Sequence, residues 1–226
     1  MPLPFGSASR GGILGTMRWR TLLVSVAGLA LALSVPTAAA EPTDEAKRLM
    51  KLRDSERYQV KTAHSSTKAG AARVHVATPK SELRKVVTDF KNYSKFIGKF
   101  DKSKVVGRDG KNTDVYLQVP ILKGAAKVWA VVRFGPIKSV DGEEVLEGHM
   151  IKGNVSRLDA WWRIKEIDDE NTQLNLELLI VSKLPVPGSV VTGEASYAAD
   201  EAVIGSRDRS EKIWAAKKKK QKSAKQ

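Results

Sequence analysis

The sequence predicts an α+β domain in which a curved antiparallel sheet of about six to seven strands is covered by one long C-terminal helix. Between residues 104 and 181, apolar side chains recur at every second position in a series of short segments. This is the pattern of strands with one buried and one wetted face. Residues 189–220 contain no proline and suit a single helix. Because a sheet with one apolar face needs a cover, we expect this helix to lie across it.

An amphipathic helix is predicted over residues 79–90. Thr78 is a suitable N-cap, and Pro79 is favourable at the first helical position. Apolar residues then follow the i, i+3, i+4, i+7 spacing of one helix face: Leu83, Val86, Val87 and Phe90. Tyr93, Phe96 and Ile97 continue this pattern past Asn92, which predicts a second short helix at an angle to the first.

Four segments show the clearest period-two alternation: residues 115–121, 128–134, 158–165 and 174–180. Turn signals lie between strands at residues 108–112, 139–142 and 168–171. Ahead of the first helix, residues 58–62 and 73–76 are predicted strands, joined by a turn at 65–70. A Leu-Pro-Val-Pro-Gly sequence at 184–188 ends the last strand.

Residues 1–40 are predicted to be a secretory signal peptide. Arg18 and Arg20 precede an apolar run at 22–33, and three alanines before Glu41 provide a small-residue cleavage site. The apolar run is shorter than the roughly 20 residues that span a bilayer. We therefore expect an exported protein, located in the periplasm or the extracellular medium.

The rest of the chain is expected to form one domain with short additions at both ends. Residues 41–55 form a charged helical lead-in that should pack at the periphery, residues 56–216 form the domain, and residues 217–226 form a lysine-rich tail. The chain has no cysteine. Disulfides, thiol nucleophiles and thiolate metal ligands are therefore excluded.

Positive charge is concentrated in the tail. The chain has a formal net charge of +14, and residues 217–226 contain six lysines and no acid. One interpretation is a solvated helix end, where cations complement the helix dipole. The other is adhesion to an anionic membrane surface through Lys217, Lys218, Lys219, Lys220 and Lys222. Nucleic acid is a less suitable partner, because the sequence shows no basic strand with interleaved aromatics and no recognition helix.

The C-terminal helix is rich in small residues: Gly193, Ala195, Ala198, Ala199, Ala202, Gly205 and Ser206. Such a cover either approaches the sheet closely or leaves a cavity for an apolar guest. If a cavity exists, its predicted lining is Phe90, Tyr93, Phe96, Val119, Ala130, Val132, Leu146, Met150, Trp162, Leu176, Leu178, Ala198 and Ala202. Each of these side chains is equally suited to ordinary core packing.

The sequence offers little for catalysis or metal binding. The three histidines, His64, His75 and His149, have no metal-ligand spacing, and His149 is expected to face solvent. Only Tyr93, Ser206 and Arg209 are candidate polar groups on the inward faces, too few to assign general acid–base chemistry. We expect no metal, no cofactor and no catalytic set.

The opposite face of the sheet is predicted to be charged and solvated. Asp159, Arg163 and Lys165 share this face with Trp161. Arg133 and Glu177 are candidates for a cross-strand ion pair, which contributes little when exposed.

The chain resembles the START-like, or SRPBCC, superfamily, and especially the branch of polyketide cyclase/dehydrase-like and coenzyme Q-binding START proteins. The residues that carry the resemblance are Val-Ala-Thr-Pro at 76–79, Asp-Phe-Lys-Asn-Tyr-Ser-Lys-Phe at 89–96, Gly148, Trp162 and Leu-Pro-Val-Pro at 184–187. The resemblance covers residues 56–216 and implies a helix-grip fold around a hydrophobic pocket. The chain departs from the family at Ile97-Gly98-Lys99, where a proline usually follows the aromatic pair.

Three functions are compatible with this resemblance and with the residues. The first is a non-enzymatic carrier of an apolar molecule such as a lipid, an isoprenoid or quinone, or a polyketide-like compound. The second is an enzyme of the cyclase or dehydratase type. The third is a packed domain that adheres to an anionic envelope surface through its lysine tail.

Overall fold

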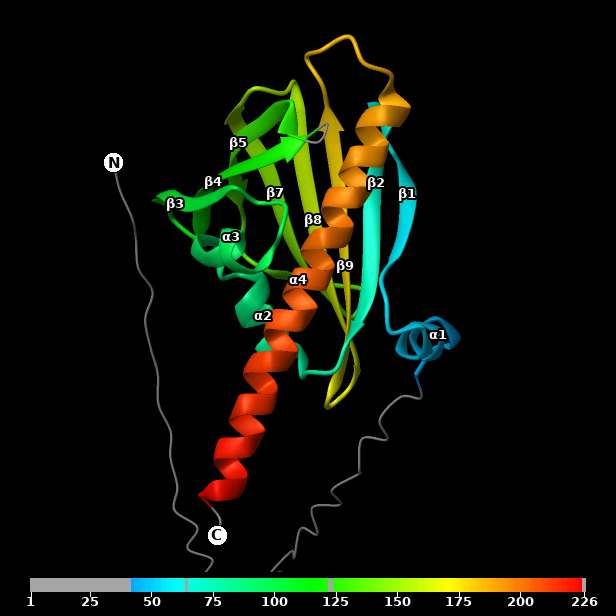
Figure 1. Ribbon diagram of the computed structural model, residues 1–226, viewed down its shortest axis with the longest axis vertical. Coiled ribbons are helices and arrows are strands. Elements are labelled where there is room, and N and C mark those ends of the chain that lie inside the picture. The colour runs from blue at the N-terminus through cyan, green and yellow to red at the C-terminus, as the bar shows by residue number, and fades with distance from the viewer. Residues whose placement is uncertain (1–41, 64, 122–123, 225–226) are drawn as a thin grey trace, which may run out of the picture. The chain divides into compact units, whose positions relative to one another are not determined.

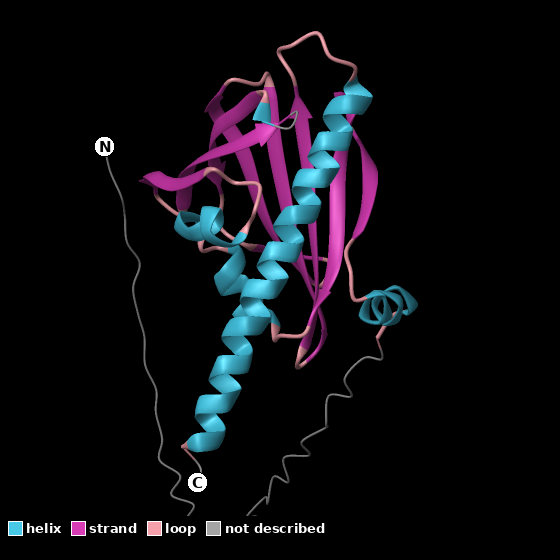
Figure 2. Ribbon diagram, in the orientation of Figure 1, coloured by secondary structure: helices cyan, strands magenta, loops and turns pink. Residues whose placement is uncertain are grey.

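The computed structural model describes residues 42–63, 65–121 and 124–224. These residues form a curved antiparallel sheet with one long helix across its concave face and two short helical segments beside that helix (Figures 1 and 2). The predicted helix-grip fold is therefore confirmed. The predicted signal peptide lies outside the described residues. None of the helices in the described part of the chain is long and apolar enough to cross a membrane.

Thirteen helices and strands and one 3₁₀ turn make up this part of the chain. In order they are α1 (Asp44–Leu52), β1 (Glu56–Thr62), β2 (Ser65–Val76), α2 (Lys80–Val87), the 3₁₀ turn η1 (Phe90–Asn92), α3 (Tyr93–Phe96), β3 (Lys102–Asp109), β4 (Asn112–Ile121), β5 (Ala126–Phe134), β6 (Lys138–Val140), β7 (Glu143–Gly153), β8 (Arg157–Asp168), β9 (Asn171–Val181) and α4 (Gly188–Ser223).

The strands pair antiparallel in the order β1-β2-β9-β8-β7-β5-β4-β3, and β6 pairs with β7. The sheet has nine strands, slightly more than predicted, partly because the three-residue β6 was not foreseen. The turn predicted at residues 65–70 was wrong, because β2 begins at Ser65 and Gly70 pairs with Gln59 on one side and Leu178 on the other.

Gly70 and Gly205 bring the backbone of α4 unusually close to its neighbours. A Cβ atom added at Gly70 would lie 2.2 Å from the backbone nitrogen of Ser196 on α4, and one at Gly205 would lie 2.2 Å from the backbone oxygen of Phe96. Real Cβ atoms do not approach other atoms so closely. Part of the small-residue content therefore allows α4 to pack closely against β2 and α3.

The first predicted helix is present but begins later than expected. α2 has Pro79 at its N-cap position, and the side chain of Thr78 does not cap it. Thr78 is fully buried, and its hydroxyl lies 2.9 Å from that of Ser210 on α4. The Thr172 hydroxyl on β9 donates a hydrogen bond of 2.7 Å to the backbone carbonyl oxygen of Thr78. Thr78 therefore joins the β2–α2 junction to α4 and β9. The second short helix is found as η1 and α3.

Two expectations about the outer face were wrong. Arg133 does not pair with Glu177, because β7 and β8 lie between their strands. Arg133 instead binds Asp114 at 2.7 Å on the neighbouring β4. Asp159 was expected to be solvated, but it is only 8% exposed and accepts a hydrogen bond from Arg157. His149 is exposed, as predicted.

Helix α1 packs against the same outer side of the sheet. Ala46 and Leu49 are its buried residues, and the Thr43 hydroxyl caps it by accepting a hydrogen bond from the backbone nitrogen of Ala46. The amide of Gln173 on β9 donates to the Glu45 carboxylate at 2.8 Å. This helix therefore covers part of the sheet away from α4.

We predict that Gly205→Ala destabilises the protein. The new methyl group would overlap the backbone of Phe96, and overpacking of this kind costs about 1–3 kcal/mol. This cost should outweigh the gain of roughly 1 kcal/mol in helix propensity. The measurement is the free energy of unfolding in urea.

Gly193→Ala is the matched control, because it lies on the same helix and a Cβ there would meet no atom within 4 Å. It should stabilise the protein by up to about 1 kcal/mol. Equal effects of the two substitutions would contradict the close contact at Gly205.

Candidate ligand-binding cavity

An apolar cavity of about 80 Å³ lies between the sheet and α4. Its floor comes from β4, β5, β8 and β9, its roof from two alanines of α4, and one side from the segment around α3. The lining residues are Tyr93, Lys99, Phe100, Leu117, Val119, Ile121, Val128, Ala130, Val132, Phe134, Leu158, Ala160, Trp162, Leu176, Leu178, Ile180, Glu194, Ala198 and Ala202. The alternation along each strand explains the floor, because every second side chain points toward the helix.

Nine of the predicted residues lie on this lining: Tyr93, Val119, Ala130, Val132, Trp162, Leu176, Leu178, Ala198 and Ala202. Four do not: Phe90, Phe96, Leu146 and Met150. Phe90 stacks on Phe134 with ring centroids 4.6 Å apart, and Phe96 packs edge-on against Tyr93 at 5.7 Å. Leu146 is buried in the hydrophobic core, and Met150 packs against that core. These four form core packing around the cavity rather than its surface.

Several lining residues were not singled out from the sequence. Leu117, Ile121 and Ile180 lie on the same strand faces as predicted members, so alternation alone could have identified them. Glu194 precedes Ala198 by four residues on one helix face. Lys99 and Phe100 lie in the segment after α3, for which the sequence contains no periodic signal.

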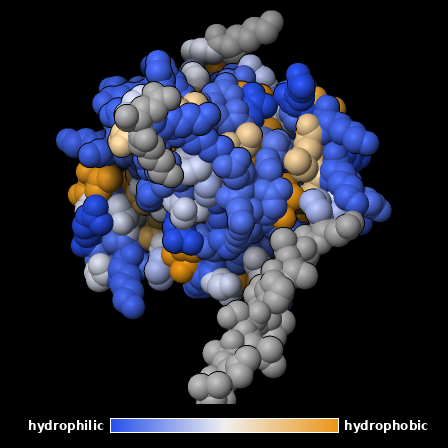
Figure 3. All heavy atoms as spheres, turned by 90° about the horizontal axis from the view of Figure 1, so that it is seen from below, coloured by the Kyte–Doolittle hydropathy of each residue, from blue (hydrophilic) through white to orange (hydrophobic). Residues whose placement is uncertain are grey.

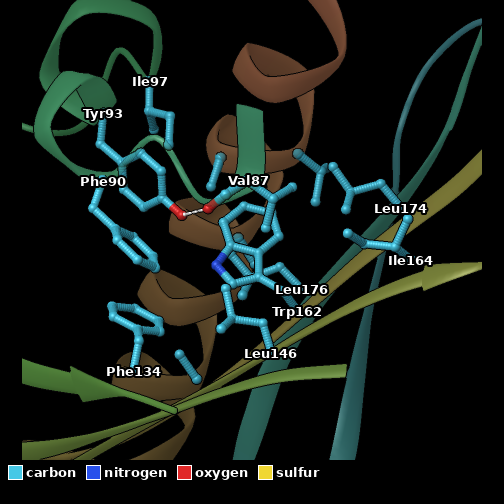
Figure 4. Close-up of a cluster of buried hydrophobic side chains, with 14 of the residues drawn as sticks. Val87, Phe90, Tyr93, Ile97, Phe134, Leu146, Trp162, Ile164, Leu174 and Leu176 are labelled. Carbon is cyan, nitrogen blue, oxygen red and sulfur yellow. Dashed lines mark hydrogen bonds between the residues drawn. The ribbon is translucent and has the colours of Figure 1, made fainter. Parts of the chain in front are cut away.

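The hydroxyl of Tyr93 is not available in the cavity. It donates a hydrogen bond to the backbone oxygen of Val87 (Figure 4). The residue is 1% exposed, and burial raises the pKa of its phenol far above the usual value. The Tyr93 ring also lies edge-on to Trp162, with centroids 6.3 Å apart. Tyr93 therefore presents an apolar ring to the cavity and keeps its polar atom in the core.

The other two polar candidates do not reach the cavity. Ser206 is fully buried in α4 but is absent from the lining, and its hydroxyl has no hydrogen-bond partner within the described residues. Arg209 is exposed. The charged residues on the wall are Lys99 and Glu194. The Lys99 ammonium lies over the ring of Tyr197, 4.0 Å from its centroid.

A second apolar cavity of about 60 Å³ adjoins the first. The two share Ile121, Val128, Ile180 and Glu194 on their walls. The second cavity is completed by Val155 in the β7–β8 turn and by residues of the β9–α4 connection and the first turn of α4: Ser182, Leu184, Val186, Val190 and Val191. Leu184, Val186 and Val190 are exposed. An apolar path therefore runs from the interior to the surface at this end of the sheet.

The two spaces are smaller than the roughly 300–1,000 Å³ of sites that hold drug-sized ligands. A larger guest requires movement of the walls, which include Lys99 and Phe100 after α3 and Glu194 near the start of α4. Within the described residues, no group of three or more histidine, aspartate and glutamate side chains is placed to hold a metal ion.

The opposite end of the domain is different in character. Figure 3 views the protein from below, the end at which α4 terminates, and shows a mostly hydrophilic surface with scattered apolar patches. Lys217 pairs with Glu82 and Lys218 with Glu170, whereas Lys219, Lys220 and Lys222 are exposed. The apolar opening and the lysine-rich tail therefore lie at opposite ends of α4.

Comparison with solved structures supports the fold. The chain is similar to a STAR-related lipid transfer protein from Xanthomonas axonopodis, with a TM-score of 0.59 and 10% identity over 69% of this chain and 93% of that one. Human STARD10 gives a TM-score of 0.57 and 11% identity over 79% and 83% of the two chains. The Zhui aromatase/cyclase from Streptomyces sp. R1128 gives 0.53 and 14% over 69% and 94%. No match was found among the curated proteins.

A family model described as polyketide cyclase/dehydrase and lipid transport matches residues 76–200, more than half of the chain. The matched segment runs from the end of β2 into α4 and includes every residue that lines the first cavity except Ala202. The chain therefore belongs to the polyketide cyclase/dehydrase and lipid transport family, and it shares its fold with the START-related structures above.

Proposed function

We propose that this protein binds one hydrophobic small molecule between the sheet and α4 and carries it without transforming it. The observation that supports this proposal is the cavity wall, which is built almost entirely from aliphatic and aromatic side chains. Burial of apolar ligand surface there would contribute roughly 25 cal/mol per Å². A lipid, an isoprenoid or quinone, or a polyketide-like compound would suit such a wall.

The three polar groups that the sequence offered for catalysis are not placed to act on a guest in the cavity. A cyclase or dehydratase requires a group that can donate or accept a proton at the substrate. The three groups that the sequence offered for this role are a bonded hydroxyl at Tyr93, a buried one at Ser206 and an exposed guanidinium at Arg209. The similar structures include both lipid transfer proteins and an aromatase/cyclase, so the fold alone does not decide between the two.

We also propose that the carrier works outside the cytoplasm, as the signal-peptide pattern of residues 1–40 indicates. A periplasmic or extracellular carrier would meet membrane surfaces when it loads or releases its guest. The three exposed tail lysines, Lys219, Lys220 and Lys222, offer a weak attachment to anionic lipid.

The carrier proposal predicts that Ala202→Leu blocks the cavity. Ala202 is buried on its roof, and the added carbons would occupy space now open to a guest. Native mass spectrometry of protein purified without detergent should show a complex with a retained apolar molecule. Because the guest is carried and not transformed, its mass after release should equal its mass before binding. The variant should lose it while keeping the circular dichroism spectrum of the folded protein.

Ala215→Leu is the matched control, because Ala215 is exposed on the same helix. It should retain the guest at the wild-type level. The carrier proposal fails if the wild-type protein shows only the bare polypeptide mass and no added lipid raises its Tm, or if Ala202→Leu retains as much guest as the control.

For the tail, Lys219, Lys220 and Lys222 replaced together by Gln should weaken binding to phosphatidylglycerol vesicles. Each lysine near the surface contributes about 1 kcal/mol, so the loss is up to about a hundredfold in affinity. Co-sedimentation at low salt measures it. The control replaces Lys102, Lys104 and Lys111, which are exposed on and beside β3 and carry the same total charge.

Equal losses in the tail variant and the β3 control would show that net charge rather than the tail is responsible. Binding that persists at 1 M salt would also contradict electrostatic attachment, because the Debye length is then only about 3 Å.

A further inference from the structure

Glu194 has an unusual position in α4. Among the residues of α4, Glu194 alone lines both cavities. It lies about one turn before the roof residue Ala198 and about two turns before Ala202. It is half-buried. Within the part of the chain that the structure describes, its carboxylate has no hydrogen bond and no ion pair, unlike the neighbouring Asp200, which binds the Ser55 hydroxyl.

The wall that the two cavities share is apolar except for Glu194. The walls that the two cavities share with it are Ile121, Val128 and Ile180. A polar group against apolar surface is costly unless it is hydrogen-bonded, and a charged one more so. Among the described residues nothing bonds the Glu194 carboxylate, so solvent or a bound molecule can supply its hydrogen bond or ion pair.

Lys99 is the other charged residue on the wall, but it is already engaged. Its ammonium lies over the Tyr197 ring. That ring lies on the exposed side of α4, where Tyr197 is 38% exposed. The aliphatic part of Lys99 is therefore what remains for the cavity. An acidic head group entering the first cavity would meet the Glu194 carboxylate, and the described residues of the wall offer no free cation to offset the repulsion.

We propose that Glu194 is the head-group acceptor of this cavity, and that the natural guest is an amphiphile whose polar end carries an ammonium or hydroxyl donor rather than a carboxylate or phosphate. The apolar body would occupy the first cavity, with the head at the junction of the two cavities. This assignment rests on the proposed carrier function and specifies the class of its ligand.

The test compares three probes with the same chain length: decylamine, decanol and decanoate. Calorimetric titration below their aggregation concentrations gives the Kd of each. A hydrogen bond to a charged group contributes about 1.5–3 kcal/mol, so we expect decylamine and decanol to bind at least about tenfold more tightly than decanoate.

The decisive variant is Glu194→Gln, which keeps the size and an acceptor oxygen but removes the charge. It should weaken decylamine about tenfold or more, weaken decanol less, because the amide oxygen still accepts a hydrogen bond, and strengthen decanoate. Asp208→Asn is the matched control, because Asp208 lies on the same helix, is exposed and, among the described residues, bonds its neighbour Arg207 alone. It should leave all three Kd values unchanged.

The outcomes separate the two proposals. If none of the probes binds the wild-type protein, the carrier function itself is overturned, and the head-group assignment with it. If the three bind equally, or Glu194→Gln behaves like Asp208→Asn, the cavity is a binding site but Glu194 is not its head-group acceptor. Tightest binding by decanoate, lost in Lys99→Gln, would place the head group at Lys99 and overturn the assignment to Glu194.

Discussion

The site depends on how closely the backbone of α4 approaches its neighbours. At Gly70 the helix meets β2 with no room for a side chain, and at Gly205 it meets the end of α3 in the same way. These contacts fix the helix on two of its faces. The face that carries Ala198 and Ala202 is turned to β4, β5, β8 and β9, and its methyl groups are too short to fill the space above those strands. Different small residues thus allow tight packing on one side of the helix and leave a cavity on another.

This arrangement resolves the two alternatives that the sequence left open. Small residues in a covering helix are compatible with close approach or with a void, and sequence spacing does not show which face of the helix meets which strand. Ala195 and Ala199 are buried and absent from the lining, whereas Ala198 and Ala202 lie on it. The distinction follows from the rotation of α4 about its axis, which is set by its contacts with Gly70 on β2 and, at Gly205, with Phe96 on α3.

Much of the sheet was predictable from the sequence because strand alternation is a local property. The inward faces of β4, β5, β8 and β9 follow directly from it. The errors concern non-local geometry. The ion pair expected between Arg133 and Glu177 required knowledge of strand order. The turn expected at residues 65–70 failed because its small residues belong to a strand covered by α4. Phe90 and Phe96 were assigned to the cavity because periodicity marks burial but does not distinguish core from cavity wall.

The positions of the polar groups at the site also could not be predicted from the sequence. The helix position of Tyr93 suggested a polar atom in the pocket, but the hydroxyl turns toward Val87. Glu194 was not considered, since acidic residues on a helix usually face solvent. Its place on the wall of both cavities depends again on the rotation of α4. The chemistry of the site is therefore determined by the tertiary contacts of this one helix.

The most direct measurement of the central claim is a crystal structure of the protein under xenon pressure. Dry apolar cavities of sufficient size bind xenon, and the space here is about 80 Å³. We expect a xenon peak between Ala202 and the Trp162 ring, unless a retained guest molecule already occupies that position. An interior filled by the side chains of the protein itself, with neither xenon nor guest density under α4, would contradict the account.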